Sequence, residues 1–338
     1  MEKNLKFPKK ILPVLQAAAF ALLGTTVLLL TALTTGPAHA QEFPNKTIKF
    51  IVPFPPGSGT DTSARFFGKK LSELIGHPVV VENKPGANGF IAVQNVLAAP
   101  ADGYTVFIGS NSTLAVNAAL FKSLPYDPIA DLAPLSMMMR SPALLIVSGT
   151  SQYKTLPELI AAASAQPDKL NYGAGSAGYQ LMAELFNDAA KVQTHHVPFK
   201  GASEAVLAVA SGTVDLAFAE MTSAQELVKA GKLRALAVAA DQRVPAMPSV
   251  ATAAEAGLPG FTAYTWVGAM VSSKTPKAET EKLARLMTQI ETMPETRAFY
   301  ERIGAQVMNG GPEEMRAFQE SEIQLWKRIV TKAKVEQQ

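Results

Sequence analysis

Short apolar runs alternate with amphipathic segments from about residue 46 onward, the pattern of a chain that builds sheets from strand-helix units. Each apolar run is short enough for a strand, and each amphipathic segment turns one apolar side to a sheet. In the first half of this region the predicted strands are Ile48–Val52, Pro78–Val81 and Tyr104–Ile108. The predicted helices are Asp61–Ile75, Gly89–Ala98 and Thr113–Ala119. The segment Pro125–Pro134 is predicted as a loop because it contains three prolines.

A second series of strands and helices repeats the outline of the first. Its predicted strands are Leu144–Val147, Leu170–Tyr172, Thr194–Val197, Val214–Phe218 and Ala235–Ala239. Its predicted helices are Leu156–Ala165, Tyr179–Ala190, Ala202–Ala210, Gln225–Ala230 and Val250–Ala256. A strand at Trp266–Met270 then returns to the first half, and the remaining predicted helices are Ala278–Thr292, Pro294–Ile303 and Pro312–Lys334. The expected fold is α/β with two lobes, each a mainly parallel sheet flanked by helices, and a cleft between them.

The first forty residues have the composition of an export signal. Four lysines in the first ten residues precede the apolar stretch Ile11–Leu33, and Ala38-His39-Ala40 offers a small-x-small cleavage pattern. Cleavage before Gln41 is expected, and an uncleaved membrane anchor is the alternative because the apolar stretch is long. The sequence therefore predicts an exported protein.

Charge and composition exclude several classes of function. The whole chain has a formal net charge of +3, but loss of residues 1–40 would leave 27 of its 31 basic and 27 of its 28 acidic residues. A neutral mature chain gives no sign of a nucleic-acid partner. The chain has no cysteine, which excludes disulfides, a thiol nucleophile and Cys-based zinc sites. Stability must come from core burial, and 48% hydrophobic residues suffice for that.

The segment Pro53–Asp61 joins a predicted strand to a predicted helix and is suited to anion binding. Its glycines let main-chain amides approach a ligand, two hydroxyl side chains lie beside them, and the helix start exposes N–H groups with partial positive charge. Asp61 fits a helix-capping role as well as a ligand contact. The expected ligand contacts from this loop are Phe54, Pro56, Gly57, Ser58, Gly59, Thr60 and Asp61.

The segment Gly173–Gly178 matches G-x-G-x-x-G between a strand and a helix and admits three interpretations. A dinucleotide site needs an acidic residue at the end of the next strand, where Thr194–Pro198 has none. A hydrolase with Ser176 as nucleophile needs an acid after a later strand, whereas Asp188 falls on the intervening helix. Anion binding by main-chain amides is the favoured interpretation, and an exported serine hydrolase using Ser176 is the alternative.

Two further strand-to-helix turns, over residues 110–113 and 197–203, also carry small polar residues. Adjacent His195 and His196 would point to opposite faces of a strand, so we expect one packed and one exposed imidazole, no metal site and no cofactor. The methionines at 137–139 and Trp266 and Trp326 are predicted to belong to the core. The remaining expected ligand contacts are Ser110, Ser112, Thr113, Gly175, Ser176, Ala177, Gly178, Tyr179, Gln180, Lys200, Ala202 and Glu220.

Eight segments together resemble the tripartite tricarboxylate transporter substrate-binding proteins of bacterial periplasms, also called the Bug family. These segments are Ile51–Asp61, Pro78–Gly86, Asp102–Tyr104, Leu124–Pro128, Lys169–Tyr172, His196–Gly201, Ala230–Val238 and Ala254–Gly260. The resemblance implies a Venus flytrap of periplasmic-binding type II topology without catalytic activity. It implies a signal peptide at 1–40, a first lobe of 41–143 plus 264–338 and a second lobe of 144–263. The two pincer loops of the family match Pro53–Asp61 and Gly173–Gln180.

The chain departs from the family pattern at positions that concern the ligand. Gly57-Ser58 stands where two glycines are usual, Gln180 where a histidine is frequent, and Ala219-Glu220 where many relatives have Asp-Asn. A carboxylate at Glu220 beside an anion site would repel a second acid group and favour an ammonium or a hydroxyl-rich ligand.

The expected function is capture of a small organic carboxylate between the lobes of a monomer. Main-chain amides and hydroxyls would hold the acid, directly or through ordered water, while the other lobe closes over it. The resemblance implies membrane subunits of a tripartite transporter as the partner that reads closure. A sensor role, with a membrane receptor as partner, is the alternative within the same fold.

Overall fold

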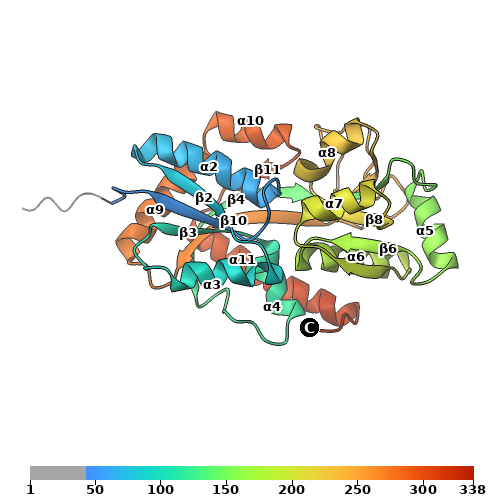
Figure 1. Cartoon of the computed structure of the whole chain (residues 1–338), viewed down its shortest axis with the longest axis horizontal. Helices are drawn as coiled ribbons and strands as arrows, with labels where there is room; N and C mark the ends of the chain where they lie inside the picture. Colours follow the sequence, from blue (N-terminus) through green and yellow to red (C-terminus); the bar gives the residue numbers. More distant parts are fainter. Residues whose placement is uncertain (1–42) are drawn as a thin grey trace, which may run out of the picture. The chain divides into compact units, whose positions relative to one another are not determined.

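The computed structural model describes residues 43–338 and groups them around two β-sheets (Figure 1). The expected export signal, its cleavage before Gln41 and the alternative of an uncleaved anchor concern a segment outside the described residues. Within the described part of the chain, none of the helices combines the length and the apolar character that a membrane crossing requires.

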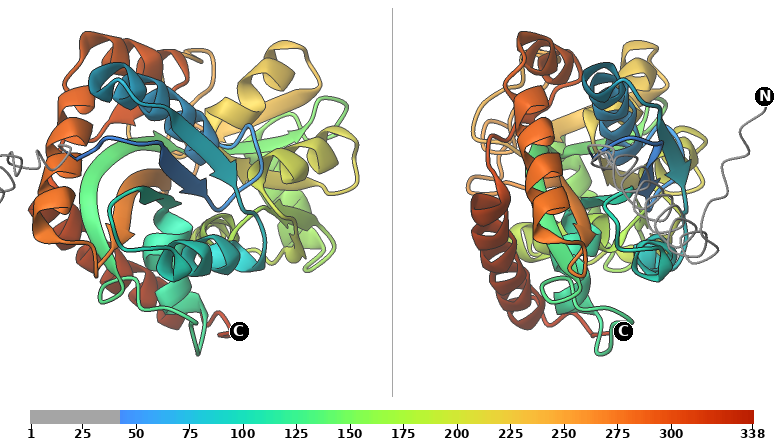
Figure 2. Two further views of the ribbon diagram at one scale, coloured as in Figure 1. Left: turned by 60° about the vertical axis from the view of Figure 1, so that its left-hand side comes forward. Right: turned by 90° about the vertical axis from the view of Figure 1, so that its left-hand side faces the viewer.

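The first sheet has the strand order β11-β4-β10-β3-β1-β2. Its strands are β1 (Ile48–Val52), β2 (Val79–Asn83), β3 (Thr105–Ser110), β4 (Leu132–Pro142), β10 (Tyr264–Ser272) and β11 (Gln306–Val307). Its helices are α2 (Gly59–Ile75), α3 (Phe90–Ala98), α4 (Asn117–Leu120), α9 (Lys277–Glu291), α10 (Pro294–Arg302) and α11 (Pro312–Lys332), with short turns η1 (Ala87–Gly89) and η2 (Ser112–Val116). Helices α9 and α11 (orange to red) pack on β4, and α2 (blue) packs on β1 and β2 (Figure 2). We refer to this sheet and its helices as the first lobe.

The second sheet has the strand order β7-β6-β8-β5-β9. Its strands are β5 (Leu144–Ser148), β6 (Asn171–Ala174), β7 (His195–Pro198), β8 (Leu216–Ala219) and β9 (Leu233–Val238). Its helices are α5 (Leu156–Ala165), α6 (Ala177–Ala190), α7 (Ala202–Ala210) and α8 (Met221–Lys229). We refer to this sheet and its helices as the second lobe.

Both sheets are mixed, whereas the sequence predicted mainly parallel ones. Strand β1 is parallel to β2 and β3, but β10 is antiparallel to β3 and β4. In the second sheet β6 is parallel to β7 and β8, but β5 is antiparallel to β8 and β9. The physical reason lies in the two chain crossings: β4 leaves the first lobe and β10 returns to it, so these neighbouring strands run in opposite directions.

The sequence prediction missed the short strand β11, and two further differences have their physical reason in strand pairing. The start of β4 was predicted as loop because of its prolines, but Pro134 pairs with Met270 next to a register shift in β10, where a residue without an N–H is tolerated. The predicted helix Val250–Ala256 is wrong. Thr252 forms an isolated bridge with Val238, and the Ala253 N–H donates to the Val238 carbonyl, so the end of β9 uses backbone groups that a helix would need.

The buried side chains follow the predicted pattern. Met138, Met139, Trp266 and Trp326 are all buried, as predicted. His195 is exposed and His196 is half-buried, stacked on Tyr172 with 5.1 Å between ring centroids, which confirms one packed and one exposed imidazole. The apolar faces of both sheets thus hold the strand-to-helix turns in fixed positions at the strand ends.

Candidate functional site

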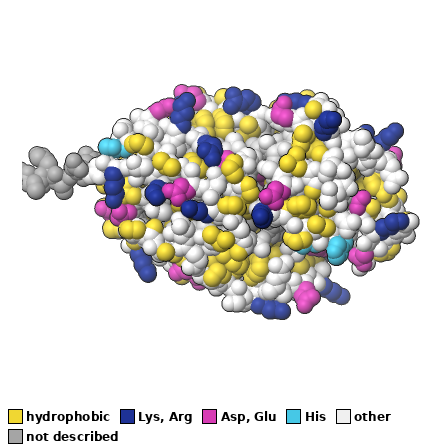
Figure 3. All heavy atoms as spheres, viewed as in Figure 1, with side chains coloured by type: hydrophobic (Ala, Val, Ile, Leu, Met, Phe, Trp, Pro, Cys, Tyr) yellow, Lys and Arg dark blue, Asp and Glu magenta, His cyan; other side chains and the backbone are white. Residues whose placement is uncertain are grey.

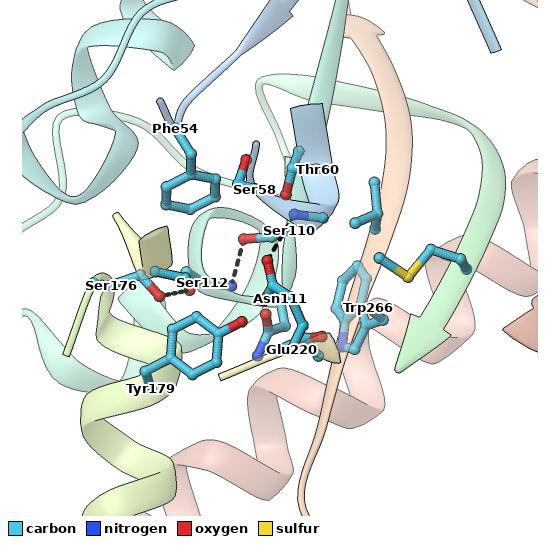
Figure 4. A pocket seen from close by; sticks show the side chains of 16 residues that line it. Phe54, Ser58, Thr60, Ser110, Asn111, Ser112, Ser176, Tyr179, Glu220 and Trp266 are labelled. Carbon is cyan, nitrogen blue, oxygen red and sulfur yellow. Dashed lines mark hydrogen bonds between the residues drawn. The ribbon is translucent and has the colours of Figure 1, made fainter. Parts of the chain in front are cut away.

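A nearly closed cavity lies where turns from the two lobes meet (Figure 4). Its interior volume is about 20 Å³, little more than one water molecule needs. Residues from both lobes line it: Phe54, Ser58, Gly59, Thr60, Ser110, Asn111, Ser112, Met139, Gly175, Ser176, Tyr179, Ala202, Glu220, Thr265, Trp266 and Val267. The cavity as it stands is therefore too small for an organic acid.

Several helices begin at the cavity because each follows a strand that ends there. Ser58 is the N-cap of α2, and its hydroxyl accepts the Asp61 N–H at 3.2 Å. Ser176 and Glu220 are the N-cap residues of α6 and α8. The first N–H groups of a helix lack intrahelical partners and carry partial positive charge. The first-lobe and second-lobe turns therefore direct anion-binding groups toward one place.

The carboxylate of Asp61 is used inside its own loop and does not line the cavity. It is 3% exposed and accepts the Gly57 N–H at 3.0 Å, the Arg65 Nε–H at 3.0 Å and the Asn83 side-chain amide at 2.9 Å. All these partners belong to the first lobe, so Asp61 fixes the shape of the loop that presents Ser58, Gly59 and Thr60.

At the cavity, three hydrogen bonds among the described residues cross between the lobes, and we refer to the residues that make them as the interlobe seam. The Ser112 hydroxyl donates to the Ser176 hydroxyl at 2.9 Å, and the Gly178 N–H donates to the Ser112 hydroxyl at 3.1 Å. The Gly59 N–H donates to Glu220 Oε1 at 2.6 Å. Away from the cavity, a hydrogen bond from Gln338 to Gln180 and an ion pair between Lys332 and Asp188 also join the lobes.

Glycines are required at the seam because the lobes approach so closely. A Cβ on Gly178 would lie 2.7 Å from Ser112 Oγ, and one on Gly201 would lie 2.7 Å from Pro55 Cδ of the other lobe. Both separations are shorter than van der Waals contact. The last glycine of the G-x-G-x-x-G pattern is thus required by the close approach of the two lobes. This explains the glycine without a bound nucleotide.

Two buried hydrogen-bonding groups at the cavity have no partner in the described residues. They are Asn111 Nδ2 and the Tyr179 hydroxyl, on side chains that are 2% and 6% exposed. The Tyr179 hydroxyl points toward Asn111 and Glu220 (Figure 4). A buried polar group left unpaired costs about 1–3 kcal/mol, so a ligand with acceptor oxygens would recover that cost.

Among the described residues that line the cavity, Glu220 is the only one with a carboxyl side chain. It is 6% exposed, and burial raises the pKa of its carboxyl, while the hydrogen bond from Gly59 N–H acts in the opposite direction. The indole N–H of Trp266 is not directed at Glu220, because it donates to Glu322 Oε2 at 2.8 Å in the first lobe.

The structure places the sequence-predicted ligand contacts in three groups. The cavity is lined by Phe54, Ser58, Gly59, Thr60, Ser110, Ser112, Gly175, Ser176, Tyr179, Ala202 and Glu220. A neighbouring opening of about 540 Å³ is lined by Gln180 and Lys200, and shares Phe54, Gly175 and Ser176 with the cavity. Neither space is lined by Pro56, Gly57, Asp61, Thr113, Ala177 or Gly178.

The predicted contacts that line neither the cavity nor the opening belong to the turns themselves. Pro56 and Gly57 are exposed, and the Thr113 hydroxyl accepts the Ser110 N–H at 3.2 Å within its own turn. Sequence reasoning missed Asn111, Met139, Thr265, Trp266 and Val267 as lining residues. Asn111 had a signal, since it lies within the polar turn 110–113, whereas the other four lie on β4 and β10 and are brought in only by sheet pairing.

The contacts of Ser176 and the surface charges bear on the other readings of the sequence. The partner of the Ser176 hydroxyl is Ser112 and not a histidine. Among the described residues no group of three His, Asp or Glu side chains could hold a metal ion. On the face drawn in Figure 3, basic and acidic side chains are interspersed over the described part of the chain. The polar groups of the cavity are thus main-chain amides, hydroxyls, the Asn111 carboxamide and the Glu220 carboxyl.

Comparison with known proteins gives a consistent result. The family described as "Tripartite tricarboxylate transporter family receptor" matches residues 63–335. Protein BugT of Bordetella pertussis (strain Tohama I) is 34% identical over 311 residues, which cover 90% of this chain and 94% of BugT.

Two solved structures with small acids are also similar to this chain. R. palustris Rpa4515 with adipate has a TM-score of 0.83 and 31% identity, covering 86% of this chain and 98% of that one. MatC (Rpa3494) from Rhodopseudomonas palustris with bound malate has a TM-score of 0.80 and 31% identity, covering 85% of this chain and 100% of MatC. These similarities extend over both lobes, and they confirm the predicted two-lobed α/β fold.

Proposed function

Because the chain belongs to the tripartite tricarboxylate transporter receptor family, whose members bind solutes and are not enzymes, we propose that it captures one small organic carboxylate in the cavity between its lobes. The proposed place of action is the periplasm, and the proposed partner is the set of membrane subunits of a tripartite transporter. The similar proteins Rpa4515 and MatC were solved with adipate and malate, which supports the carboxylate class.

The observation that carries this proposal is the pair of unpaired buried donors at the cavity. Asn111 Nδ2 and the Tyr179 hydroxyl have no partner within the described residues, and both line a space between helix N-termini of two lobes. A carboxylate offers several acceptor lone pairs and a negative charge. It would satisfy both donors and interact favourably with the helix ends.

Charge-assisted hydrogen bonds can supply a gross binding free energy of the required size without an arginine in the cavity. A hydrogen bond to a charged group contributes about 1.5–3 kcal/mol, and micromolar affinity requires about −8 kcal/mol. Four or five such contacts from Asn111, Tyr179, hydroxyls and main-chain amides reach that value before the costs of ordering and closure are subtracted.

The proposed cycle is opening, capture and closure. The lobes would comprise residues 41–143 with 264–338 and residues 144–263, joined where β4 leads into β5 and where β9 leads to β10. Separation would break the three bonds of the interlobe seam and admit the acid. Closure would remake them over the ligand, and the membrane subunits would recognise the closed form.

A thermal-shift screen tests the proposal. Purified protein is heated with a panel of mono- and dicarboxylates and with neutral amides of the same sizes as controls. Binding to the native state alone raises the melting temperature, so at least one acid should raise it while the matched amide does not. The variant Asn111→Ala should reduce the shift and keep the fold.

The serine hydrolase alternative is tested with the same acids as esters. Turnover that Ser176→Ala abolishes would contradict the proposal. Retained binding that the variant only weakens would support it.

A further inference from the structure

We propose that Glu220 makes the cavity select a ligand that presents a hydrogen-bond donor, an ammonium or a hydroxyl group, to this side chain in place of a second carboxylate. The inference rests on the proposed function and narrows its substrate class. It predicts that the preferred acid differs from the dicarboxylates adipate and malate seen in the similar structures.

The geometry places the Glu220 carboxylate inside the ligand space. The side chain starts from the N-cap of α8 in the second lobe and reaches the first lobe, where Oε1 accepts the Gly59 N–H at 2.6 Å. Gly59 is the first residue of α2, so this N–H belongs to the group of amides suited to an anion. A carboxylate of the protein itself therefore uses an amide that a ligand acid group would otherwise use.

No cation compensates this charge at the cavity. Among the described residues that line the cavity, none is Lys, Arg or His, and no ion pair to Glu220 is present. Lys200 lines the neighbouring opening and is exposed. Because burial raises the pKa of the Glu220 carboxyl, a ligand carboxylate could lie beside it only while Glu220 is protonated, whereas a ligand ammonium would stabilise the ionised form.

The remaining groups define what the ligand offers. Asn111 Nδ2 and the Tyr179 hydroxyl serve one carboxylate, and Glu220 accepts a hydrogen bond from the second polar end. An amino acid or a hydroxy acid has one carboxylate and one donor. It satisfies all three side chains without placing two acid groups in the cavity.

The test uses matched acids that differ only at the second end. Malonate, 3-hydroxypropanoate and 3-aminopropanoate form the three-carbon set, succinate, 4-hydroxybutanoate and 4-aminobutanoate the four-carbon set, and adipate, 6-hydroxyhexanoate and 6-aminohexanoate the six-carbon set. Dissociation constants are measured by calorimetry at about pH 8.5, where the amines are still charged. In the length that binds best, the amino or hydroxy acid should bind at least about tenfold more tightly than the diacid.

The variant Glu220→Gln assigns the preference to the charge. Glutamine keeps an oxygen for the Gly59 N–H and removes the acid. The dissociation constants of the diacid and of the amino or hydroxy acid should therefore differ by no more than about threefold. Glu226→Gln on the exposed side of α8 is the matched control, and it should leave the ratio unchanged. Glu220→Asp keeps the charge and should keep the preference for the donor ligand.

Each outcome decides the matter. The inference is overturned if the wild-type protein binds the diacid as tightly as the amino and hydroxy acids of the same length. It is also overturned if a tenfold preference survives in Glu220→Gln. In both cases the proposed function stands. Should Glu220→Gln fail to fold, loss of the preference in Glu220→Asp overturns it. Binding of no acid in any set overturns the proposed function, and the inference with it.

Discussion

The cavity and the interior of the first lobe each contain a buried glutamate and a buried tyrosine with an unpaired hydroxyl. At the cavity these are Glu220 and Tyr179, and in the first lobe they are Glu291 and Tyr300. Burial raises the pKa of both glutamates, and that of Glu291 reaches about 8. The two regions are therefore alike in burial and in the direction of their pKa shifts.

They differ in their surroundings. Glu220 accepts a hydrogen bond across the interlobe seam and lines a cavity. Neither oxygen of Glu291 has a hydrogen bond, although Ser136 lies close by, and Glu291 lines none of the cavities described above. Unpaired groups at a cavity can be satisfied by a ligand, whereas those inside a lobe only destabilise the fold. A raised pKa at a buried acid therefore does not by itself mark a binding site: Glu220 lies at a cavity between the lobes, and Glu291 does not.

The largest expected effect concerns Glu291 and stability. Between pH about 4.5 and about 8 the folded chain holds a proton on Glu291 that the unfolded chain has lost, so the free energy of unfolding falls as pH rises through this window. Glu291→Gln should remove this decrease and raise the free energy of unfolding at about pH 9 by up to about 4 kcal/mol. Urea unfolding from about pH 4 to 9 measures it.

Ligand affinity and a surface variant provide the controls for that experiment. Glu291→Gln should leave the affinity for the carboxylate unchanged, because the residue lies away from the cavity. Glu281→Gln, on the exposed side of the same helix, should retain the wild-type decrease with pH. An undiminished decrease in Glu291→Gln would show that other groups cause it.

A second experiment separates closure of the lobes from folding. In Gly178→Ala the new Cβ would overlap Ser112 Oγ, so the lobes should not close fully. Overpacking of this kind costs about 1–3 kcal/mol, which predicts a loss of ligand affinity of roughly tenfold to a hundredfold with little change in unfolding. Calorimetric titration measures the first quantity and urea unfolding the second.

Gly311→Ala is the matched control for Gly178→Ala. A Cβ there meets only the flexible end of Glu314, at 3.3 Å, away from the seam. It should leave affinity unchanged. Equal losses of affinity in both variants would contradict the role of the seam.

A smaller effect on ligand affinity is expected at Tyr179, with Tyr300 as the matched control. Tyr179→Phe removes a hydroxyl that the ligand is expected to use, so affinity should fall about five- to tenfold, in line with about 1 kcal/mol for one hydrogen bond. Tyr300→Phe removes an equally unpaired hydroxyl and should leave affinity unchanged. Neither change should destabilise the free protein. A Tyr179→Phe protein with full affinity would remove Tyr179 from the site.

The smallest expected effect is that of Lys200 in the opening beside the cavity. Lys200 is exposed and lines the wider opening, where its charge attracts anions but is screened by salt. Lys200→Gln should lower affinity about twofold at low salt and not at all at high salt. Titrations at two salt concentrations measure this, and a salt-independent tenfold loss would instead indicate direct contact with the ligand.

Local signals determined how far the sequence predicted the fold. Strand β1 begins and ends where its apolar run predicted, and α9 and α11 agree with their patterns within a few residues. Strand β4 was missed because a proline within a strand is tolerated only through the register of its partner β10, which is a long-range property. The predicted helix Val250–Ala256 failed for the same reason, since pairing with β9 overrides helix propensity.

The candidate site shows the same division between local and long-range information. Strand-to-helix turns with Gly and Ser are local, and they led to Ser58, Thr60 and Ser176. Trp266 lines the cavity because β10 pairs with β3 and β4, whereas the sequence predicted only that this side chain belongs to the core. The engagement of Asp61 with Gly57, Arg65 and Asn83 also depends on folding, because Asn83 comes from another strand.

A crystal structure with the tightest-binding acid of the panel tests the central claim most directly. The account predicts that the carboxylate lies between the two lobes, within hydrogen-bond distance of both Asn111 Nδ2 and the Tyr179 hydroxyl. An acid bound elsewhere, such as in the groove of about 740 Å³ between Phe121–Ile129 and α11, with both donors still unpaired, would contradict it.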